Sequence, residues 1–132
     1  MRSPVSNEFM LVLELAGVEI DYCPLTRGIW LDAGELEVLY GDEDAAKGLL
    51  SSFIKDERCR EPKVRCPICR KKMEKVVATK NIIIDRCTMG HGLWFDEGEL
   101  IEVLRSHPKG ESEKIIALLK DMFKSNIRID KQ

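Results

Sequence analysis

The sequence predicts an α+β fold made of two similar units, each a short β-hairpin and a helix, followed by a further helix. Two observations predict it: the 132 residues contain an internal repeat, and each copy pairs strand-like segments with amphipathic helical patterns. A unit of about 65 residues buries little apolar surface and often needs a metal or a partner to stay folded. The predicted division is residues 1–55 for the first unit, 56–65 for a linker and 66–132 for the second unit.

The internal repeat relates residues 1–36 to residues 64–100, with one residue inserted in the second copy. Between residues 20–36 and residues 84–100, nine of seventeen positions are identical, which chance matching does not give. We therefore interpret the chain as a tandem duplication.

A β-hairpin is predicted at the start of each copy. Residues 8–15 and 18–23 form its strands in the first copy, and residues 72–79 and 81–87 form them in the second. Val, Ile and Leu dominate these segments, as the pleated surface of a sheet prefers.

A short helix is predicted after each hairpin, over residues 33–40 and 97–106. An Asp at the N-cap can accept from the N3 amide, while a Glu three residues later reaches back to the cap amide. These carboxylates thus have a structural explanation, which we favour over a catalytic one. The pairs are Asp32 with Glu35 in the first copy and Asp96 with Glu99 in the second.

A further helix is predicted after each unit, one starting at Asp42 or Asp44 and one near Glu111. Trp30 and Trp94 lie just before the caps and are expected to cover the hairpins. His107 precedes a proline and is expected to be an exposed helix-end residue. The apolar stripes of the two further helices are Ala46, Leu49, Leu50, Phe53 and Ile54, and Ile115, Leu118, Leu119, Met122 and Phe123.

The second copy carries potential metal ligands at the spacing of a zinc site. Structural zinc takes four thiolate or imidazole ligands, usually as two close pairs about 15–20 residues apart. Cys66 and Cys69 form a C-x2-C pair, Cys87 follows at the expected distance, and glycines flank His91. We predict a Cys3His site for one structural Zn²⁺ per chain, which His91→Ala should weaken. Two alternatives stay open: the cysteines are small buried hydrophobes, or His91 is a turn residue and water or another side chain completes the site.

The first copy has lost most of these ligands. Ser3, Ser6 and Thr26 stand at three of the ligand positions, and Cys23 alone remains. A hydroxyl is a poor zinc ligand at neutral pH, so this copy is predicted to be metal-free, held by packing, with Cys23 as a buried apolar thiol. Cys59 lies alone in the linker and is expected to be a bystander.

The second copy resembles the transcription factor IIB-type zinc-finger family. The resemblance lies in Cys66-Pro67-Ile68-Cys69 and in the run from Gly92 to Leu100, Gly-Leu-Trp-Phe-Asp-Glu-Gly-Glu-Leu. The first copy resembles only the second half of the pattern, and His91 replaces the family's usual cysteine. The resemblance covers most of residues 1–40 and 64–104 and implies that each unit is zinc-ribbon-like. The family name suggests transcription, but a fold does not establish a function.

The charge is distributed unevenly along the chain. Residues 1–54 carry 3 basic and 10 acidic side chains, whereas residues 55–80 carry 10 basic and 4 acidic ones. The basic stretch at 58–75 could contact nucleic acid or an acidic partner, or it could simply keep the linker and hairpin solvated. No apolar run is long enough for a membrane span, and five cysteines without an export signal predict a reducing, cytoplasmic location.

Together these patterns predict a small non-enzymatic zinc-binding protein that binds nucleic acid or another protein, with a link to transcription. One alternative is a module for protein–protein interaction or homodimer formation with no nucleic-acid role. A remote alternative is a zinc hydrolase-like enzyme, which would need water in the place of His91. Neither a small-molecule substrate nor a membrane partner is expected.

Overall fold

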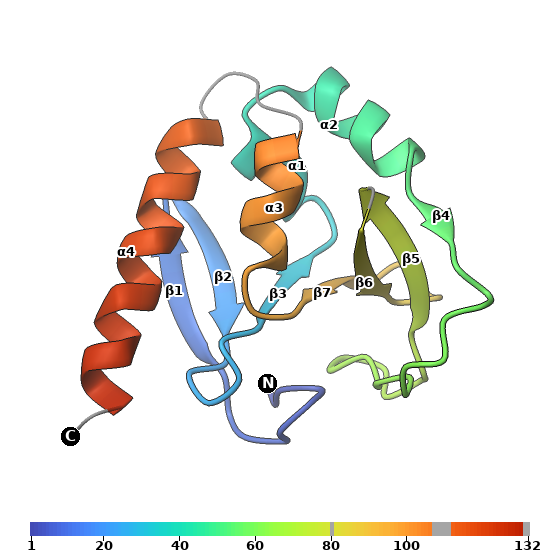
Figure 1. Cartoon of the computed structure of the whole chain (residues 1–132), viewed down its shortest axis with the longest axis horizontal. Helices are drawn as coiled ribbons and strands as arrows, with labels where there is room; N and C mark the ends of the chain where they lie inside the picture. The colour runs from blue at the N-terminus through green and yellow to red at the C-terminus, as the bar shows by residue number, and fades with distance from the viewer. Residues whose placement is uncertain (80, 107–111, 131–132) are drawn as a thin grey trace.

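The computed structural model describes residues 1–79, 81–106 and 112–130, with side chains described for residues 1–79, 81–106 and 113–124. These residues form one sheet with helices packed against it, so the predicted α+β class is confirmed (Figure 1). In chain order the elements are β1 (Leu11–Leu15), β2 (Val18–Tyr22), β3 (Ile29–Asp32), α1 (Glu35–Tyr40), α2 (Glu43–Ser51), β4 (Ile54–Lys55), β5 (Glu74–Thr79), β6 (Ile82–Arg86), β7 (Gly92–Phe95), α3 (Glu99–Ser106) and α4 (Ser112–Asp130).

Strands from both copies lie in one antiparallel sheet of order β1-β2-β3-β7-β6-β5-β4. The two copies meet at its centre, where β3 pairs with β7 and Trp30 lies opposite Trp94. Strands β3, β7 and the two-residue β4 were not predicted from the sequence. Runs of three large apolar residues, 29–31 and 93–95, have no readable period, so a short buried strand resembles the segment that leads into a helix.

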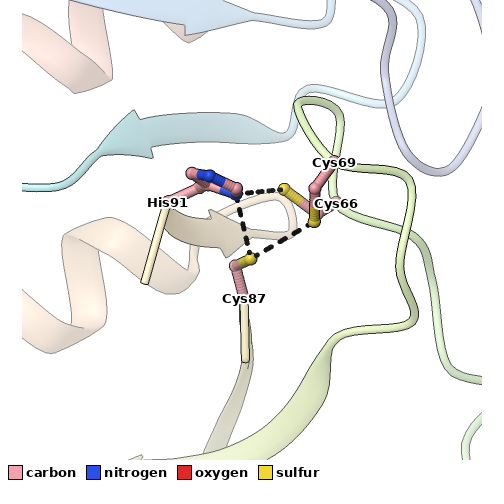
Figure 2. Close-up of side chains that lie close together, drawn as sticks. All are labelled: Cys66, Cys69, Cys87 and His91. Atoms are coloured by element: carbon pink, nitrogen blue, oxygen red, sulfur yellow. Dashed lines mark hydrogen bonds between the residues drawn. The ribbon is translucent and has the colours of Figure 1, made fainter. Parts of the chain in front are cut away.

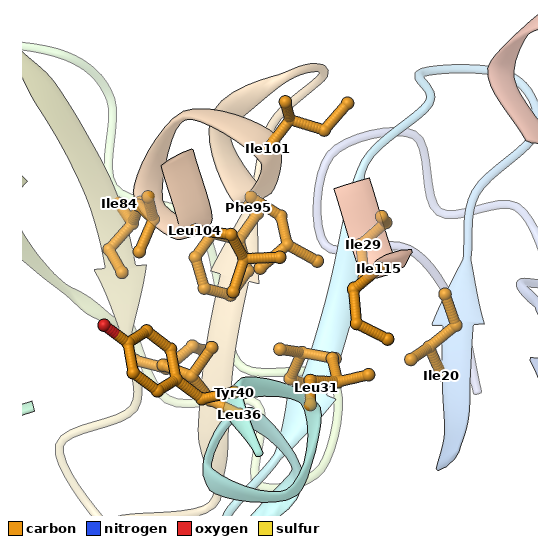
Figure 3. Close-up of a cluster of buried hydrophobic side chains, with 14 of the residues drawn as sticks. Ile20, Ile29, Leu31, Leu36, Tyr40, Ile84, Phe95, Ile101, Leu104 and Ile115 are labelled. Carbon is orange, nitrogen blue, oxygen red and sulfur yellow. The ribbon is translucent and has the colours of Figure 1, made fainter. Parts of the chain in front are cut away.

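The larger hydrophobic core lies between the sheet and the four helices (Figure 3). Ile29 and Leu31 of β3 and Phe95 of β7 face this core, because alternate residues of a strand point to the same side. The predicted helical stripes are largely confirmed, since Ala46, Leu49, Ile115 and Leu119 are buried in the core and Leu50, Met122 and Phe123 pack against it. Three positions differ: Leu118 is exposed, Phe53 is buried in the core but lies beyond the end of α2, and Ile54 lies in β4 with its side chain exposed.

A smaller core covers the opposite face of the sheet and contains both tryptophans. Each indole packs on a glycine of the other copy. A Cβ added at Gly28 would lie 2.1 Å from Cζ2 of Trp94, and one added at Gly92 would lie 2.7 Å from Cζ2 of Trp30. The copies therefore interlock through two reciprocal contacts. The other buried members of this core are Met10, Cys23, Cys66, Met73 and Cys87.

The start of α1 differs in part from the predicted capping box. Glu35 Oε1 accepts from the Asp32 amide at 2.6 Å, as expected, and Glu99 accepts from Asp96 at 2.8 Å. The Asp32 side chain does not cap α1, which starts after Gly34 without a side-chain cap. Asp32 instead accepts from Trp30 Nε1 at 2.8 Å, because a buried indole N–H needs an acceptor. In the same way, Asp96 accepts from Trp94 Nε1 at 3.0 Å.

The predicted N-cap of the next helix is confirmed at Asp42, whose side chain accepts from the Ala45 amide at 3.1 Å. The prediction for His107 lies outside the described residues. Among the described helices, none combines the length and the apolar character that a membrane span requires.

Candidate metal centre

The four predicted ligands come from three points of the second copy (Figure 2). Cys66 and Cys69 lie in a tight turn ahead of β5, Cys87 follows the last residue of β6, and His91 precedes the first residue of β7. Pairing of β6 with β5 and with β7 brings these points to one end of the sheet. Cys66 and Cys87 are buried, while Cys69 and His91 are half-buried.

The donor atoms of these four side chains all lie within 4.8 Å of one another. The Sγ atoms of Cys69 and Cys87 are 3.7 Å apart, and His91 Nδ1 lies 3.4 Å from Cys87 Sγ and 3.9 Å from Cys66 Sγ. Ordinary Zn–S and Zn–N bond lengths give a tetrahedron with edges of about 3.8 Å between sulfurs and about 3.6 Å between sulfur and nitrogen. The three thiols and the imidazole thus fit a zinc ion in both chemistry and spacing.

Backbone amides around the cysteines point at the sulfurs. The Ile68 amide donates to Cys66 Sγ at 3.4 Å, and the Met89 amide donates to Cys87 Sγ at 3.3 Å. Burial raises the pKa of Cys66 to about 11. Burial would also raise the pKa of Cys87, but backbone hydrogen bonds from His91 and Met89 lower it to about 7. Metal binding must therefore displace a proton from Cys66 at neutral pH, while Cys87 is already close to its thiolate form.

Gly90 explains how a histidine can reach the site. Gly90 is the third residue after Cys87 and adopts the left-handed conformation, with φ of 81°. In the first copy the third residue is Thr26, and the left-handed residue comes one later, at Arg27 with φ of 64°. The second copy therefore turns one residue earlier. That turn directs the side chain of the fourth residue, His91, toward the sulfurs.

The first copy keeps the shape of the site with hydroxyls in place of thiols. The Val5 amide donates to Ser3 Oγ at 3.2 Å, and the Thr26 amide donates to Cys23 Sγ at 3.5 Å. Ser6 Oγ lies 3.5 Å from Cys23 Sγ, close to the 3.7 Å between the corresponding sulfurs of the second copy. Hydrogen bonds thus link the turns that a metal would link. The prediction that packing alone holds this copy did not include them. Ser3 and Ser6, which stand where the second copy has Cys66 and Cys69, were the sequence signal for these hydrogen bonds.

Cys23 is fully buried, as predicted, but its thiol is hydrogen-bonded to Ser6 and to the Thr26 amide and is therefore not the apolar thiol that the sequence predicted. Burial would raise the pKa of its thiol, but hydrogen bonds from Ser6 and Thr26 outweigh that effect and lower the pKa to about 7. Over the described ranges, the cluster of the second copy is the single group of three or more His, Cys, Asp or Glu side chains placed to hold a metal ion.

Comparison with known protein families agrees with this geometry. A family model described as transcription factor zinc-finger, of the zinc-ribbon type, matches residues 4–40 and 65–106. The chain belongs to this zinc-finger family. The two matched ranges fall on the two copies, so the family pattern occurs twice, and the cluster of the second copy supports zinc as its metal. Comparisons with curated proteins and with solved structures give no match.

The hydroxyl-filled site should regain zinc when its missing thiols are restored. The triple substitution Ser3→Cys, Ser6→Cys and Thr26→Cys, together with Cys23, is expected to raise the zinc content from one to two ions per chain. The physical reason is that the turns already stand at ligand spacing, with amides directed at Ser3 and Cys23. Elemental analysis of the folded protein measures the change.

A matched control places three cysteines outside this site, through Ser51→Cys, Ser52→Cys and Ser106→Cys. This variant should keep one zinc per chain. A correctly folded triple variant of the first copy that still binds a single zinc would contradict the proposed equivalence of the two sites.

Proposed function

We propose that this zinc-finger protein is non-enzymatic, that Cys66, Cys69, Cys87 and His91 hold one structural zinc, and that it functions by binding nucleic acid. The observation that carries the structural role is the convergence of four protein donors. Four protein ligands complete a tetrahedral site and leave no position for substrate or activated water. Zinc bound there would cross-link the turn before β5 to the β6–β7 connection.

We further propose that residues 1–55 and 66–132 are two zinc-ribbon-like units, joined by the linker at 56–65. The two family matches support this division. The reciprocal packing of Trp30 and Trp94 on glycines of the opposite copy indicates that the units fold together. The proposed binding surface is therefore a property of both copies.

The charges around the turn that contains Cys66 and Cys69, which we call the zinc knuckle, support a nucleic-acid partner. Exposed cations follow one another along the linker and the knuckle, at Lys63, Arg65, Arg70, Lys71 and Lys72. Lys75 does not join them, because it is buried and its ammonium lies 2.7 Å from a carboxylate oxygen of Asp85. A run of unburied cations on one segment attracts the phosphates of nucleic acid.

Zinc analysis and an oligonucleotide titration test this function. The purified protein should carry one zinc per chain, and His91→Ala should weaken zinc binding measured against a chelator. Binding to DNA or RNA should fall steeply as salt rises, because phosphate contacts release counterions. Negligible binding at low salt would remove the nucleic-acid role, and unchanged zinc affinity in the variant would remove His91 from the ligand set.

The carboxylates at the helix starts do not favour an enzyme. Burial raises the pKa of Glu99 to about 7, a value that would suit a general base. Glu99 nevertheless accepts from the Asp96 amide, and Asp96 in turn accepts from the indole of Trp94. Both carboxylates therefore have structural partners.

An interaction with another protein is the second candidate, and one observation favours it. Strand β1 lies at the edge of the sheet, and Phe9, Leu11 and Val12 on or next to it are between 50% and 65% exposed. An exposed apolar edge strand can pair with another chain. The apolar stripes of α2 and α4 do not contribute in the same way, since they pack largely on the core. Sedimentation at high protein concentration tests self-association, and a strictly monomeric protein would count against it.

A further inference from the structure

A groove of about 250 Å³ runs between the first turns of the two copies, and we call it the knuckle groove. One wall comes from the turn that contains Ser3, and the other comes from the end of the linker and the turn that contains Cys66. We propose that the knuckle groove binds the phosphodiester backbone of single-stranded nucleic acid, an inference that rests on the proposed nucleic-acid function. The charged residues that line the knuckle groove are Arg2, Lys63, Arg65 and Arg70.

The lining of the knuckle groove contains four cations and no carboxylate. In the part of the chain that the structure describes, none of these four cations forms an ion pair with an acidic side chain. Several cations elsewhere are paired with carboxylates, whereas the charge of the groove remains available to an anion. The pairs elsewhere include Arg27 with Glu97, Lys75 with Asp85, Arg86 with Glu74 and Arg105 with Glu102.

Two of the guanidinium groups are held in place by the turns themselves. Arg2 Nη1 donates to the Asn7 carbonyl at 2.9 Å, and Arg65 Nη1 donates to the Arg70 carbonyl at 3.0 Å. The Arg2 guanidinium also lies over the Phe9 ring, 4.1 Å from its centroid. Each of these contacts uses part of a guanidinium and leaves other N–H groups to donate. The two arginines are therefore positioned before a phosphate arrives, which lowers the entropic cost of binding.

The two copies position these arginines by different means. Arg65 precedes the zinc-ligating Cys66 and closes its turn. Arg2 occupies the equivalent position before Ser3, where hydroxyl hydrogen bonds maintain the turn. The copy that has lost its thiols thus still contributes one wall and one cation to the groove.

The dimensions of the groove favour a single strand over a duplex or a small ligand. Its volume lies below the roughly 300–1,000 Å³ typical of small-molecule pockets, and its four cations can contact successive phosphates of a strand that passes along it. Val5 and Ile68 hold equivalent positions at the tips of the two turns and are 50% and 45% exposed. A single strand can turn its bases toward such apolar side chains, whereas a duplex keeps its bases stacked.

The test compares two variants that each remove three positive charges from the zinc-loaded 132-residue chain. The groove variant combines Arg2→Gln, Lys63→Gln and Arg70→Gln. The control variant combines Lys47→Gln, Arg105→Gln and Lys114→Gln on α2, α3 and α4, which do not line the groove. The probe is a labelled single-stranded oligothymidylate, titrated between 50 and 200 mM salt. Zinc content and thermal unfolding are measured for each protein.

Four phosphate contacts on a single strand predict a slope of about −2.8 in log affinity against log salt, or about fifty-fold weaker binding across this range. The groove variant should bind more than about ten-fold more weakly at 50 mM salt, and its slope should flatten by about 2. The control variant should stay within about three-fold of the wild type. Lys63→Glu alone should also weaken binding, and this exposed linker position keeps the test valid if the triple variant misfolds.

Equal losses in the groove and control variants would overturn the assignment to the groove while leaving nucleic-acid binding intact. A wild-type protein that does not bind the probe would overturn both the groove and the proposed function. Tighter binding to a duplex of the same length, or equal competition by polyglutamate, would overturn the single-strand phosphodiester as the ligand.

Discussion

Replacing Cys66 with serine is expected to remove zinc from the protein and to lower its free energy of unfolding by more than about 4 kcal/mol. A hydroxyl at this position cannot supply the thiolate, and the sulfur of the buried Cys66 lies within 4.8 Å of the donor atoms of Cys87 and His91. Denaturant unfolding measures the destabilisation, and elemental analysis measures the zinc. A chelator added to the wild-type protein should reproduce the effect without any substitution.

The chain offers a matched control in Cys59→Ser. Cys59 is a free cysteine in the linker and is not part of the cluster that holds the other thiols. This substitution should leave zinc content unchanged and alter stability by less than about 0.5 kcal/mol, the usual range for positions away from the core. If Cys66→Ser kept the same zinc content as Cys59→Ser, Cys66 would not be a metal ligand, whatever its effect on stability.

The loss of zinc should destabilise the first copy as well. Cys66 and Cys87 pack in the same small core as Trp30 and Cys23, which belong to the first copy. A turn that loosens around Cys66 therefore exposes apolar side chains of both copies. For this reason we expect one cooperative unfolding transition in the wild-type protein.

The metal ligands could be predicted from the sequence because their spacing is a chemical constraint. Two thiols in a C-x2-C turn, a third at the end of the next hairpin and a flanking histidine have few other uses in one small unit. The structure brings all four together. The hairpins were likewise predictable from their strand-like composition, to within a few residues at their ends.

The central strands could not be predicted because their partners are distant in sequence. Strand β3 has only four residues, and its place in the sheet depends on pairing with β7, whose residues are 60 to 66 positions away. The capping prediction failed at Asp32 for a similar reason. The local pattern favours a capping box. The N–H of Trp30, however, is buried at the junction of the copies and needs an acceptor, and the Asp32 carboxylate accepts from it.

Substituting either glycine at this junction should destabilise the protein strongly. In Gly92→Ala, the new Cβ would lie 2.2 Å from the Leu31 carbonyl oxygen, which is backbone and cannot move aside easily. In Gly28→Ala, it would lie 2.1 Å from the buried Trp94 ring. We expect each substitution to cost about 2–4 kcal/mol, at or above the usual range for overpacking. Denaturant unfolding of the zinc-loaded proteins measures the cost.

Gly48→Ala is the matched control for this prediction. Gly48 lies within α2, and a Cβ there would meet nothing within 4 Å, so alanine should stabilise the helix by about 0.5–1 kcal/mol. A free energy of unfolding that rises in the control and falls in the junction variants would mean that the two copies are held together by close backbone-to-indole contact. Small effects at both Gly28 and Gly92 would mean that β3 and β7 separate easily. The knuckle groove, which takes one wall from each copy, could not then be a fixed binding surface.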